Sequence, residues 1–182
     1  DRYAALAANR ACVCIHAAAT EASGQKIAFQ VVSGESAMLS GRPDAYVGAH
    51  KRRIAGEQAR LGTSSSLIDV STVRAADELR SHGMTSVDFA SIDIEGGELS
   101  CLKGLLDDDI RVGIICVENN YGGGAVHQLL RRRGYLRIAR LGSDDVYRLA
   151  TECDQSQVSD ARMYVVRNWR SIVQNARRRW RW

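Results

Sequence analysis

The chain has 182 residues, of which 45% are hydrophobic, and a formal net charge of +4. This length suffices for one well-buried core and is short for two, so we expect one main domain. No apolar run approaches the roughly 20 residues that a membrane-spanning helix needs, and the first ten residues lack the hydrophobic stretch of a secretory signal. These features argue against an integral membrane protein and predict a soluble, cytoplasmic one.

The positive charge is concentrated at the C-terminal end. Residues 161–182 contain seven arginines, all three tryptophans and no acidic residue, so the preceding part of the chain is slightly acidic. We therefore divide the chain into a main domain, residues 1–150, and a basic tail, residues 151–182. Apolar residues in the tail recur at the spacing of an amphipathic helix, and most of its arginines lie off that stripe. The stripe consists of Val165, Trp169, Ile172, Ala176 and Trp180.

The first third of the main domain gives a coarse pattern of elements. Residues 2–9 read as an alanine-rich helix, residues 11–17 as a short buried strand and residues 27–32 as a second strand. Residues 33–66 are rich in glycine, serine and charge and contain the single proline, Pro43. We expect an irregular excursion there, with one or two short strands.

The pattern becomes regular after Leu67. Ser71 or Thr72 is predicted to cap the first helix of this part. Expected strands span residues 67–70, 87–94, 112–117, 135–141 and 146–150, and expected helices span residues 73–82, 97–106 and 125–133. Strands alternating with helices predict an α/β fold with a mostly parallel sheet and helices on both faces. In such a sheet, ligands bind beyond the carboxyl ends of the strands.

Two of the expected strands end in acidic residues. Asp93 and Glu95 are two positions apart, so an extended backbone would point both side chains the same way. The next strand ends at Glu118 and Asn119. If the two strands are neighbours, three carboxylates converge at one edge of the sheet. Clustered carboxylates repel one another unless a cation or a donor-rich ligand compensates, which makes such clusters candidates for function, although an acidic strand end can also be a solvated turn or a helix cap.

Other chemistry has little support in the sequence. The cysteines are scattered without metal spacing, and we expect them to be reduced and structural; they are Cys12, Cys14, Cys101, Cys116 and Cys153. The histidines have no paired spacing and are predicted to be structural or on the surface; they are His16, His50, His82 and His127. No segment resembles a GxSxG elbow, a phosphate-binding P-loop or a zinc quartet, so hydrolase and nucleotide-phosphate functions are not favoured.

Residues 87–105 resemble the signature of FkbM-type methyltransferases. In that family an aspartate, a glutamate–glycine pair, a second glutamate and a leucine–lysine–glycine occur at this spacing, as they do here in Asp93, Glu95-Gly96, Glu98 and Leu102-Lys103-Gly104. Residues 117–120 are similar to the family's next strand end, and residues 129–147 to its closing elements. The resemblance extends over roughly residues 2–149.

The resemblance implies a Rossmann-like class I methyltransferase fold that uses S-adenosylmethionine. Family members begin with a strand and a glycine-rich turn around the methionine part of this cofactor, followed by a strand whose acidic end binds the ribose. Neither precedes the match here, so the chain is expected to be an N-terminally truncated member with its first strands missing.

The resemblance also implies roles for individual residues. Asp93 would lie beside the transferred methyl group and orient or deprotonate a substrate hydroxyl, with Glu95 and Glu118 as further catalytic candidates. His16 and Ala17 would line the adenine, so that these two and Asp93 are the expected cofactor-binding residues. By similarity to metal-assisted O-methyltransferases, Asp93, Glu118 and Asn119 could bind Mg²⁺ and lower the pKa of a hydroxyl.

Two classes of function stay open at this point. The first is an O-methyltransferase acting on a hydroxyl of a sugar, a glycolipid or a secondary metabolite. The second is a non-catalytic module that keeps the fold and uses its basic tail to bind a partner, a membrane or nucleic acid. For the enzyme we expect a small-molecule or saccharide acceptor, self-association or contact with an anionic surface through the tail, and no specific nucleic acid.

Overall fold

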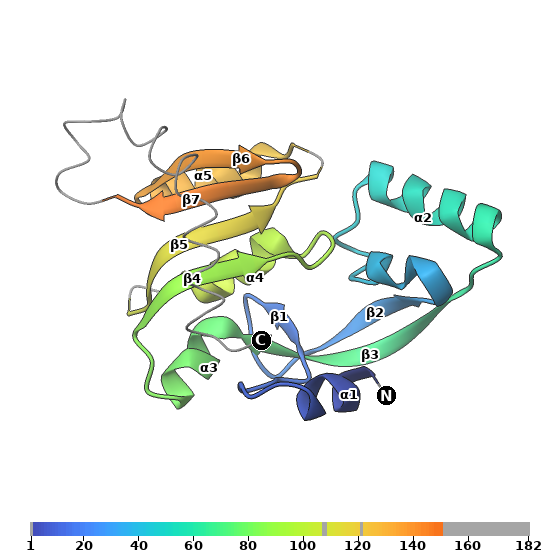
Figure 1. Ribbon diagram of the computed structural model, residues 1–182, viewed down its shortest axis with the longest axis horizontal. Coiled ribbons are helices and arrows are strands. Elements are labelled where there is room, and N and C mark those ends of the chain that lie inside the picture. Colours follow the sequence, from blue (N-terminus) through green and yellow to red (C-terminus); the bar gives the residue numbers. More distant parts are fainter. Residues whose placement is uncertain (1, 107–108, 121, 151–182) are drawn as a thin grey trace.

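The computed structural model describes residues 2–106, 109–120 and 122–150 (Figure 1). Its helices are α1 (Arg2–Ala8), η1 (Gly34–Leu39, a 3₁₀ helix), α2 (Gly48–Leu61), α3 (Ala75–Ser81), α4 (Glu98–Leu105) and α5 (Gly124–Arg132). Its strands are β1 (Ala18–Thr20), β2 (Lys26–Val32), β3 (Ser65–Arg74), β4 (Ser86–Ile92), β5 (Arg111–Glu118), β6 (Tyr135–Leu141) and β7 (Asp144–Leu149). No helix within these ranges is both long and apolar enough to cross a bilayer.

The strands form two mixed sheets. The four-stranded sheet has the order β4-β5-β7-β6, in which β4 and β5 are parallel while β7 is antiparallel to both of its neighbours. The three-stranded sheet has the order β1-β3-β2, with β1 parallel and β2 antiparallel to β3. The prediction of a mostly parallel sheet is therefore wrong. The short turn at residues 142–143 forces β6 and β7 to run in opposite directions, because parallel strands need a long crossover.

The main core lies on one face of the four-stranded sheet. Ile115 and Val117 of β5 are fully buried there against Leu102 of α4 and Leu130 of α5. Helix α3 joins the same core through Ala76. The opposite face carries a separate cluster, whose buried members are Cys116, Ile138 and Val146 and which contains only strand residues. In the described part of the chain, α3, α4 and α5 thus cover one face of this sheet, whereas the sequence had suggested helices on both.

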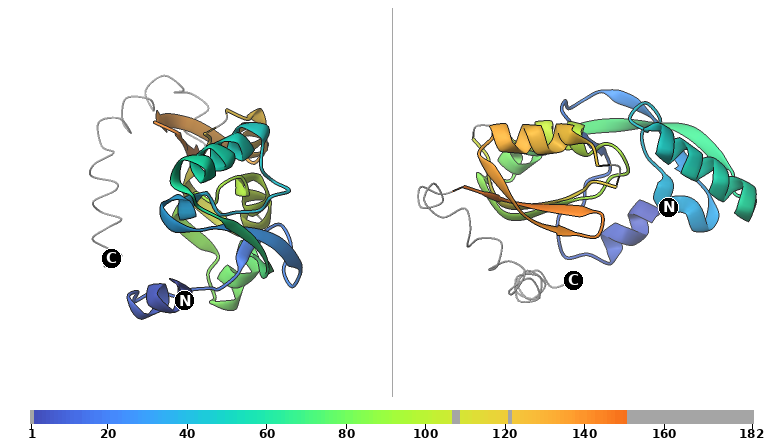
Figure 2. Two further views of the ribbon diagram at one scale, coloured as in Figure 1. Left: turned by 90° about the vertical axis from the view of Figure 1, so that its right-hand side faces the viewer. Right: turned by 90° about the horizontal axis from the view of Figure 1, so that it is seen from above.

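A lobe lies beside this core, opposite the carboxyl ends of β4 and β5 (Figures 1 and 2). It comprises η1 and α2 together with the parts of β2 and β3 that carry them; we call residues 29–66 the α2 lobe. Its own small core is formed by Val32, Leu39, Tyr46 and Ile54. This cluster is separate from the main core, so the lobe has an independent apolar centre.

Helix α4, which carries part of the signature, packs very closely against β1 at Gly104. A Cβ atom built on Gly104 would lie 2.0 Å from the carbonyl oxygen of Thr20, so only glycine fits here. Lys103 Nζ lies 3.1 Å from Glu21 Oε2, and Ser100 Oγ accepts a hydrogen bond from the Glu21 amide. The leucine–lysine–glycine of the signature is thereby explained as the attachment of β1 to the main core.

Most of the predicted helices and strands are confirmed, and some are wrong. The helices at residues 2–9, 97–106 and 125–133 and the strands at residues 27–32, 87–94, 112–117, 135–141 and 146–150 are confirmed within a few residues. The predicted strand at residues 11–17 is wrong: the segment is irregular and mostly exposed, and β1 begins only at Ala18. Its apolar side chains misled the pattern because they are not buried; Val13, for example, is 64% exposed.

Two further expectations need correction. Residues 33–66 are not largely irregular, because α2 occupies 14 of them. Its apolar periodicity is weak, since only His50 and Ile54 of this helix are buried. Strand β3 continues through Ser71 and Thr72, so neither caps a helix; α3 begins after Arg74, which has extended backbone angles. The β-branched Thr72 and Val73 pair with β1, and this tertiary pairing overrides the capping preference.

Candidate functional site

The candidate site lies where β4 and β5 end side by side. These strands are parallel neighbours in register, with Ser91 opposite Cys116 and Ile92 opposite Val117. Both strands are anchored in the main core by Ile92 and Val117, which are 6% and 0% exposed. The residue after Ile92 and the residue after Val117 are both acidic, so Asp93 and Glu118 lie at the same edge of the sheet.

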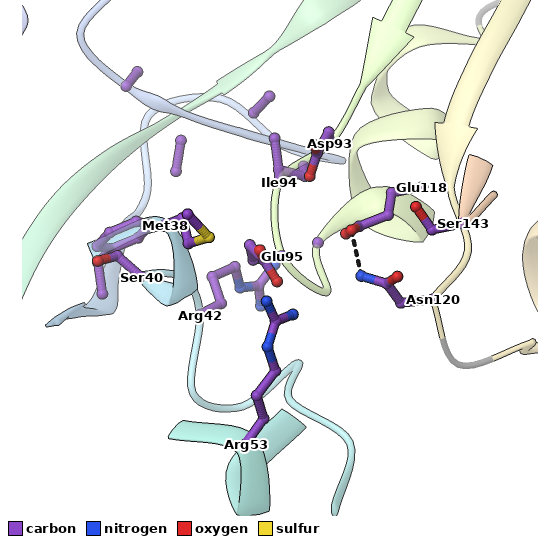
Figure 3. Close-up of a pocket in the computed structure, with 15 residues that line it drawn as sticks. Met38, Ser40, Arg42, Arg53, Asp93, Ile94, Glu95, Glu118, Asn120 and Ser143 are labelled. Atoms are coloured by element: carbon purple, nitrogen blue, oxygen red, sulfur yellow. Dashed lines mark hydrogen bonds between the residues drawn. The ribbon is translucent and has the colours of Figure 1, made fainter. Parts of the chain in front are cut away.

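Three carboxylates meet at this edge. One oxygen each of Asp93, Glu95 and Glu118 can be chosen so that all three lie within 4.8 Å of one another. Figure 3 shows the three side chains around one hollow, with Glu118 joined to the amide of Asn120 by a hydrogen bond. The predicted convergence of three carboxylates at this edge is therefore confirmed as geometry. We call these three residues the carboxylate cluster.

The turn after β4 is held by a buried glutamate. Glu98 is 9% exposed, and its Oε1 accepts hydrogen bonds from the backbone amides of Ile94, at 3.2 Å, and Gly96, at 2.9 Å. Gly96 has φ +101° and Glu95 has φ +51°. A left-handed conformation costs a non-glycine residue about 1–2 kcal/mol. The second glutamate of the signature thus closes the turn that presents Glu95, rather than entering the cluster itself.

A cavity of about 870 Å³ lies between the cluster and the α2 lobe. The cluster and the Ser143 turn form one wall, and the small residues Ala17, Ala18 and Ala19 form another. The third wall belongs to the lobe and its strand, and consists of Phe29, Met38, Ser40, Arg42 and Arg53. This size lies within the range of small-molecule sites, and the lining mixes apolar surface with a few convergent polar groups.

Burial, together with neighbouring charges, raises the pKa of two acids of the site. The pKa of Glu118 is raised to about 7, first by burial and then by the neighbouring charges of Asp93, Glu95 and Glu98. The pKa of Glu95 is also raised by burial, although the charges of His50 and Arg53 oppose the shift. A carboxyl group whose pKa lies near neutrality can accept and release a proton under ordinary conditions. Such groups in a cavity are typical of functional sites.

Asn119, the third predicted metal ligand, has its amide directed elsewhere. Its Nδ2 donates to Asp145 Oδ2 at 2.8 Å. Asp145 is fully buried, and its other oxygen lies 3.5 Å from Arg137 Nη1. The neighbouring Asn120 lines the cavity and donates to Glu118. The third oxygen close to Asp93 and Glu118 is therefore supplied by Glu95, and a metal role for Asn119 stays a prediction.

Of the two residues predicted to line the adenine, Ala17 lies at the cavity and His16 is not among the residues that line it. Ala17 lines the cavity, as does Asp93. His16 is exposed, and its ring stacks on Tyr3 of α1 with centroids 4.3 Å apart and planes at 5°. The cysteines of the described segments, Cys12, Cys14, Cys101 and Cys116, are free thiols. The predictions for Cys153 and for the whole basic tail concern residues outside the described ranges.

The α2 lobe supplies site residues that the sequence did not suggest. Arg53 extends from α2 toward Glu95 in Figure 3. His50, on the same helix, is 1% exposed, and its Nδ1 lies 3.4 Å from Glu95 Oε2. Met38 and Arg42 complete the wall. A lone histidine or arginine in a glycine- and serine-rich stretch gives no sign of a partner some forty residues later, so sequence reasoning had no signal for them.

Fold and site together define an α/β protein with a carboxylate-lined cavity at the carboxyl ends of two parallel strands. Residues 4–137 match the family model of the methyltransferase FkbM domain. The match covers most of the chain, so the protein belongs to the FkbM methyltransferase family. Neither a curated protein nor a solved structure matches it.

Proposed function

We propose that this chain carries the acceptor side of an S-adenosylmethionine-dependent O-methyltransferase, with Asp93, Glu95 and Glu118 as the residues that act on the acceptor hydroxyl. The observation that carries the proposal is the carboxylate cluster. It stands on rigid strand ends, opens into a cavity of about 870 Å³ and includes a glutamate whose pKa is raised to about 7.

The reaction needs a proton acceptor at this place. When a hydroxyl oxygen attacks the methyl carbon of a sulfonium, a C–O bond forms, the C–S bond breaks with its electron pair going to sulfur, and the hydroxyl proton must leave. Glu118 suits the role of general base, because its raised pKa brings proton affinity close to neutrality. Asp93, directly after the buried end of β4, suits the role of fixing the hydroxyl in line with the methyl group.

The walls of the cavity suit a donor and an acceptor side by side. Ala17, Ala18 and Ala19 have no side-chain atoms beyond Cβ, so they leave room for a flat group such as adenine, and Phe29 offers a ring nearby. The lobe wall with Met38, Ser40 and Arg42 faces the cluster across the same space. A wall of apolar and hydrogen-bonding groups fits a hydroxylated acceptor such as a sugar, a glycolipid or a secondary metabolite.

A divalent cation also fits the cluster. Carboxylate oxygens are the ligands that Mg²⁺ prefers, and the crowding that raises the pKa of Glu118 is the crowding that a cation would relieve. Asp93, Glu95 and Glu118 would hold the ion. Asn119 is the further ligand that the sequence suggested, and its amide nitrogen donates to Asp145. A bound Mg²⁺ would lower the pKa of a coordinated hydroxyl.

The experiment combines binding and turnover. S-adenosylhomocysteine is titrated calorimetrically into the chain and into the same chain carrying a family glycine-rich segment upstream of Asp1. Methyl transfer from a labelled donor to a panel of free sugars and glycosides is then measured. Asp93→Asn is expected to reduce turnover about 10²-fold, the order of loss that misplacement of a reacting group causes, and to weaken binding of S-adenosylhomocysteine far less.

The control variant is Asp69→Asn on β3. Asp69 is exposed and lies outside the cavity lining, so this change removes the same charge without touching the site. Turnover in Asp93→Asn equal to that of the Asp69→Asn control would refute the assignment. If neither version of the chain binds S-adenosylhomocysteine and neither transfers a methyl group, the proposed methyltransferase activity is refuted.

A further inference from the structure

The α2 lobe contacts the turn after β4 through a buried side-chain pair, His50 and Glu95. His50 Nδ1 lies 3.4 Å from Glu95 Oε2, and the two side chains are 1% and 13% exposed. The contact has the distance of an ion pair without the alignment of a hydrogen bond, and Glu95 Oε2 is buried without a hydrogen-bond partner among the described residues. Glu95 thus directs one oxygen at the lobe from within the carboxylate cluster.

The lobe fixes the ring of His50 from two sides. Its Nε2 lies 3.4 Å from the carbonyl oxygen of Leu39, and its ring packs on Tyr46 with centroids 4.2 Å apart. Tyr46 is itself held, because its hydroxyl donates to the same Leu39 carbonyl at 3.0 Å. His50 therefore belongs to the small core of the lobe and presents a fixed edge to Glu95.

The contacts of the ring determine which nitrogen faces Glu95. A carbonyl oxygen only accepts, so His50 Nε2 carries a hydrogen toward Leu39. Nδ1 is then the ring nitrogen that faces Glu95 Oε2, at 3.4 Å, and both side chains are largely buried. The pair thereby holds the Glu95 side chain in one orientation.

The backbone of the turn needs such support. Glu95 has φ +51°, a conformation that L-residues adopt only when their surroundings impose it. The lobe presses against the same residue, since a Cβ built on Gly41 would lie 3.0 Å from the Glu95 carbonyl oxygen. Other charges facing Glu95 are Arg53 of α2, Asp93 and Glu98. The lobe therefore acts on Glu95 through backbone packing, an exposed cation and the buried His50.

We propose that His50 is a positioning residue that holds Glu95 in the carboxylate cluster, so that docking of the α2 lobe completes the reaction site. The inference rests on the proposed function only where it calls the cluster a reaction site. The contact itself belongs to the folded chain, and its test uses neither methyl donor nor acceptor.

The test is a double-mutant cycle on the 182-residue chain with His50→Ala, Glu95→Gln and the double variant, followed by urea unfolding. If the two residues are coupled, the midpoint of the double variant falls by clearly less than the sum of the two single decreases, because either single change already breaks the contact. A histidine that only fills the lobe core gives additive shifts, which would overturn the proposal. Arg52→Ala with Glu95→Gln is the matched control on the same helix, and this pair should be additive. If His50→Ala does not fold, His50→Gln takes its place in the cycle.

A spectroscopic readout separates positioning from packing. In protein labelled with glutamate carrying ¹³C at Cδ, the Glu95 signal is the one missing from Glu95→Gln. It is expected to move in His50→Ala and to stay in place in Arg52→Ala. An unmoved Glu95 signal in His50→Ala would overturn the proposal. Intact coupling together with absent methyl transfer would contradict the proposed function alone.

Discussion

The main core and the α2 lobe carry opposite walls of the same cavity but differ in how they are held. The main core contains Leu102, Ile115 and Leu130, all 0% exposed, and fixes the acids of the site at strand ends. The lobe has a buried apolar cluster of four residues and contacts the turn after β4 through His50. The wall that bears the proposed chemistry is therefore the more firmly supported, and the lobe wall opposite it is the easier to alter.

The largest expected effect tests this difference in support directly. Leu102→Ala is expected to lower the free energy of unfolding by about 4 kcal/mol, because the surrounding core cannot collapse around the cavity. Ile54→Ala in the lobe is expected to cost about 2 kcal/mol, since its few neighbours can relax. Urea unfolding of both variants measures the two values. An equal or greater loss for Ile54→Ala would show that the lobe is as tightly packed as the core.

A pair of glycine substitutions sharpens the comparison. Gly104→Ala places a Cβ within 2.0 Å of the Thr20 carbonyl oxygen and is expected to destabilise the protein by about 1–3 kcal/mol. Gly56→Ala, on α2, meets no atom within 4 Å and is expected to stabilise by about 0.5–1 kcal/mol, because alanine is the better helix former. Thermal unfolding gives both signs. A stable Gly104→Ala protein would mean that β1 is not held closely against α4.

The smallest expected effect concerns the pH dependence of stability. The pKa of Glu118 in the folded protein, about 7, lies above its ordinary value of 4.5, so the folded state binds the proton more tightly than the unfolded state does. The contribution of Glu118 to stability is then fully present below about pH 4.5 and is lost as the pH rises through about 7. Glu118→Gln removes this dependence.

Urea midpoints of both proteins between pH 4 and pH 8 measure it, with the span chosen to bracket the two pKa values. The wild-type midpoint should fall more steeply than that of Glu118→Gln as the pH rises toward 7, because only the wild type loses the stabilisation from the proton on Glu118. Parallel curves would mean that the site does not perturb Glu118 in solution.

The sequence predicted best where the chain is locally consistent. The segments around Asp93 and Glu118 combine a buried apolar run, an acidic end and a helix start, and each of these signals depends only on near neighbours. The convergence of the two acids followed from one rule, that adjacent parallel strands end at the same edge. Glu98 and Gly104 both belong to the signature. That Glu98 holds the turn and that Gly104 allows the close approach to β1 is visible only in the fold.

The lobe was predicted poorly for an equally physical reason. Helix α2 buries only His50 and Ile54, so its apolar periodicity is too weak to distinguish it from a loop. The strand predicted at residues 11–17 failed for the opposite reason, because apolar side chains such as Val13 lie exposed. The antiparallel pairing of β2 with β3 and of β7 with β5 also escaped prediction, since a strand sequence does not state the direction of its partner.

By itself the sequence determined the family, the α/β alternation and the identity of the acids at the strand ends, because these depend on short segments whose signals are local. Only the tertiary structure decided that Asn119 turns its amide to Asp145 and that His50 reaches Glu95. Those contacts join residues distant along the chain, and their geometry is fixed by packing, which no local pattern encodes.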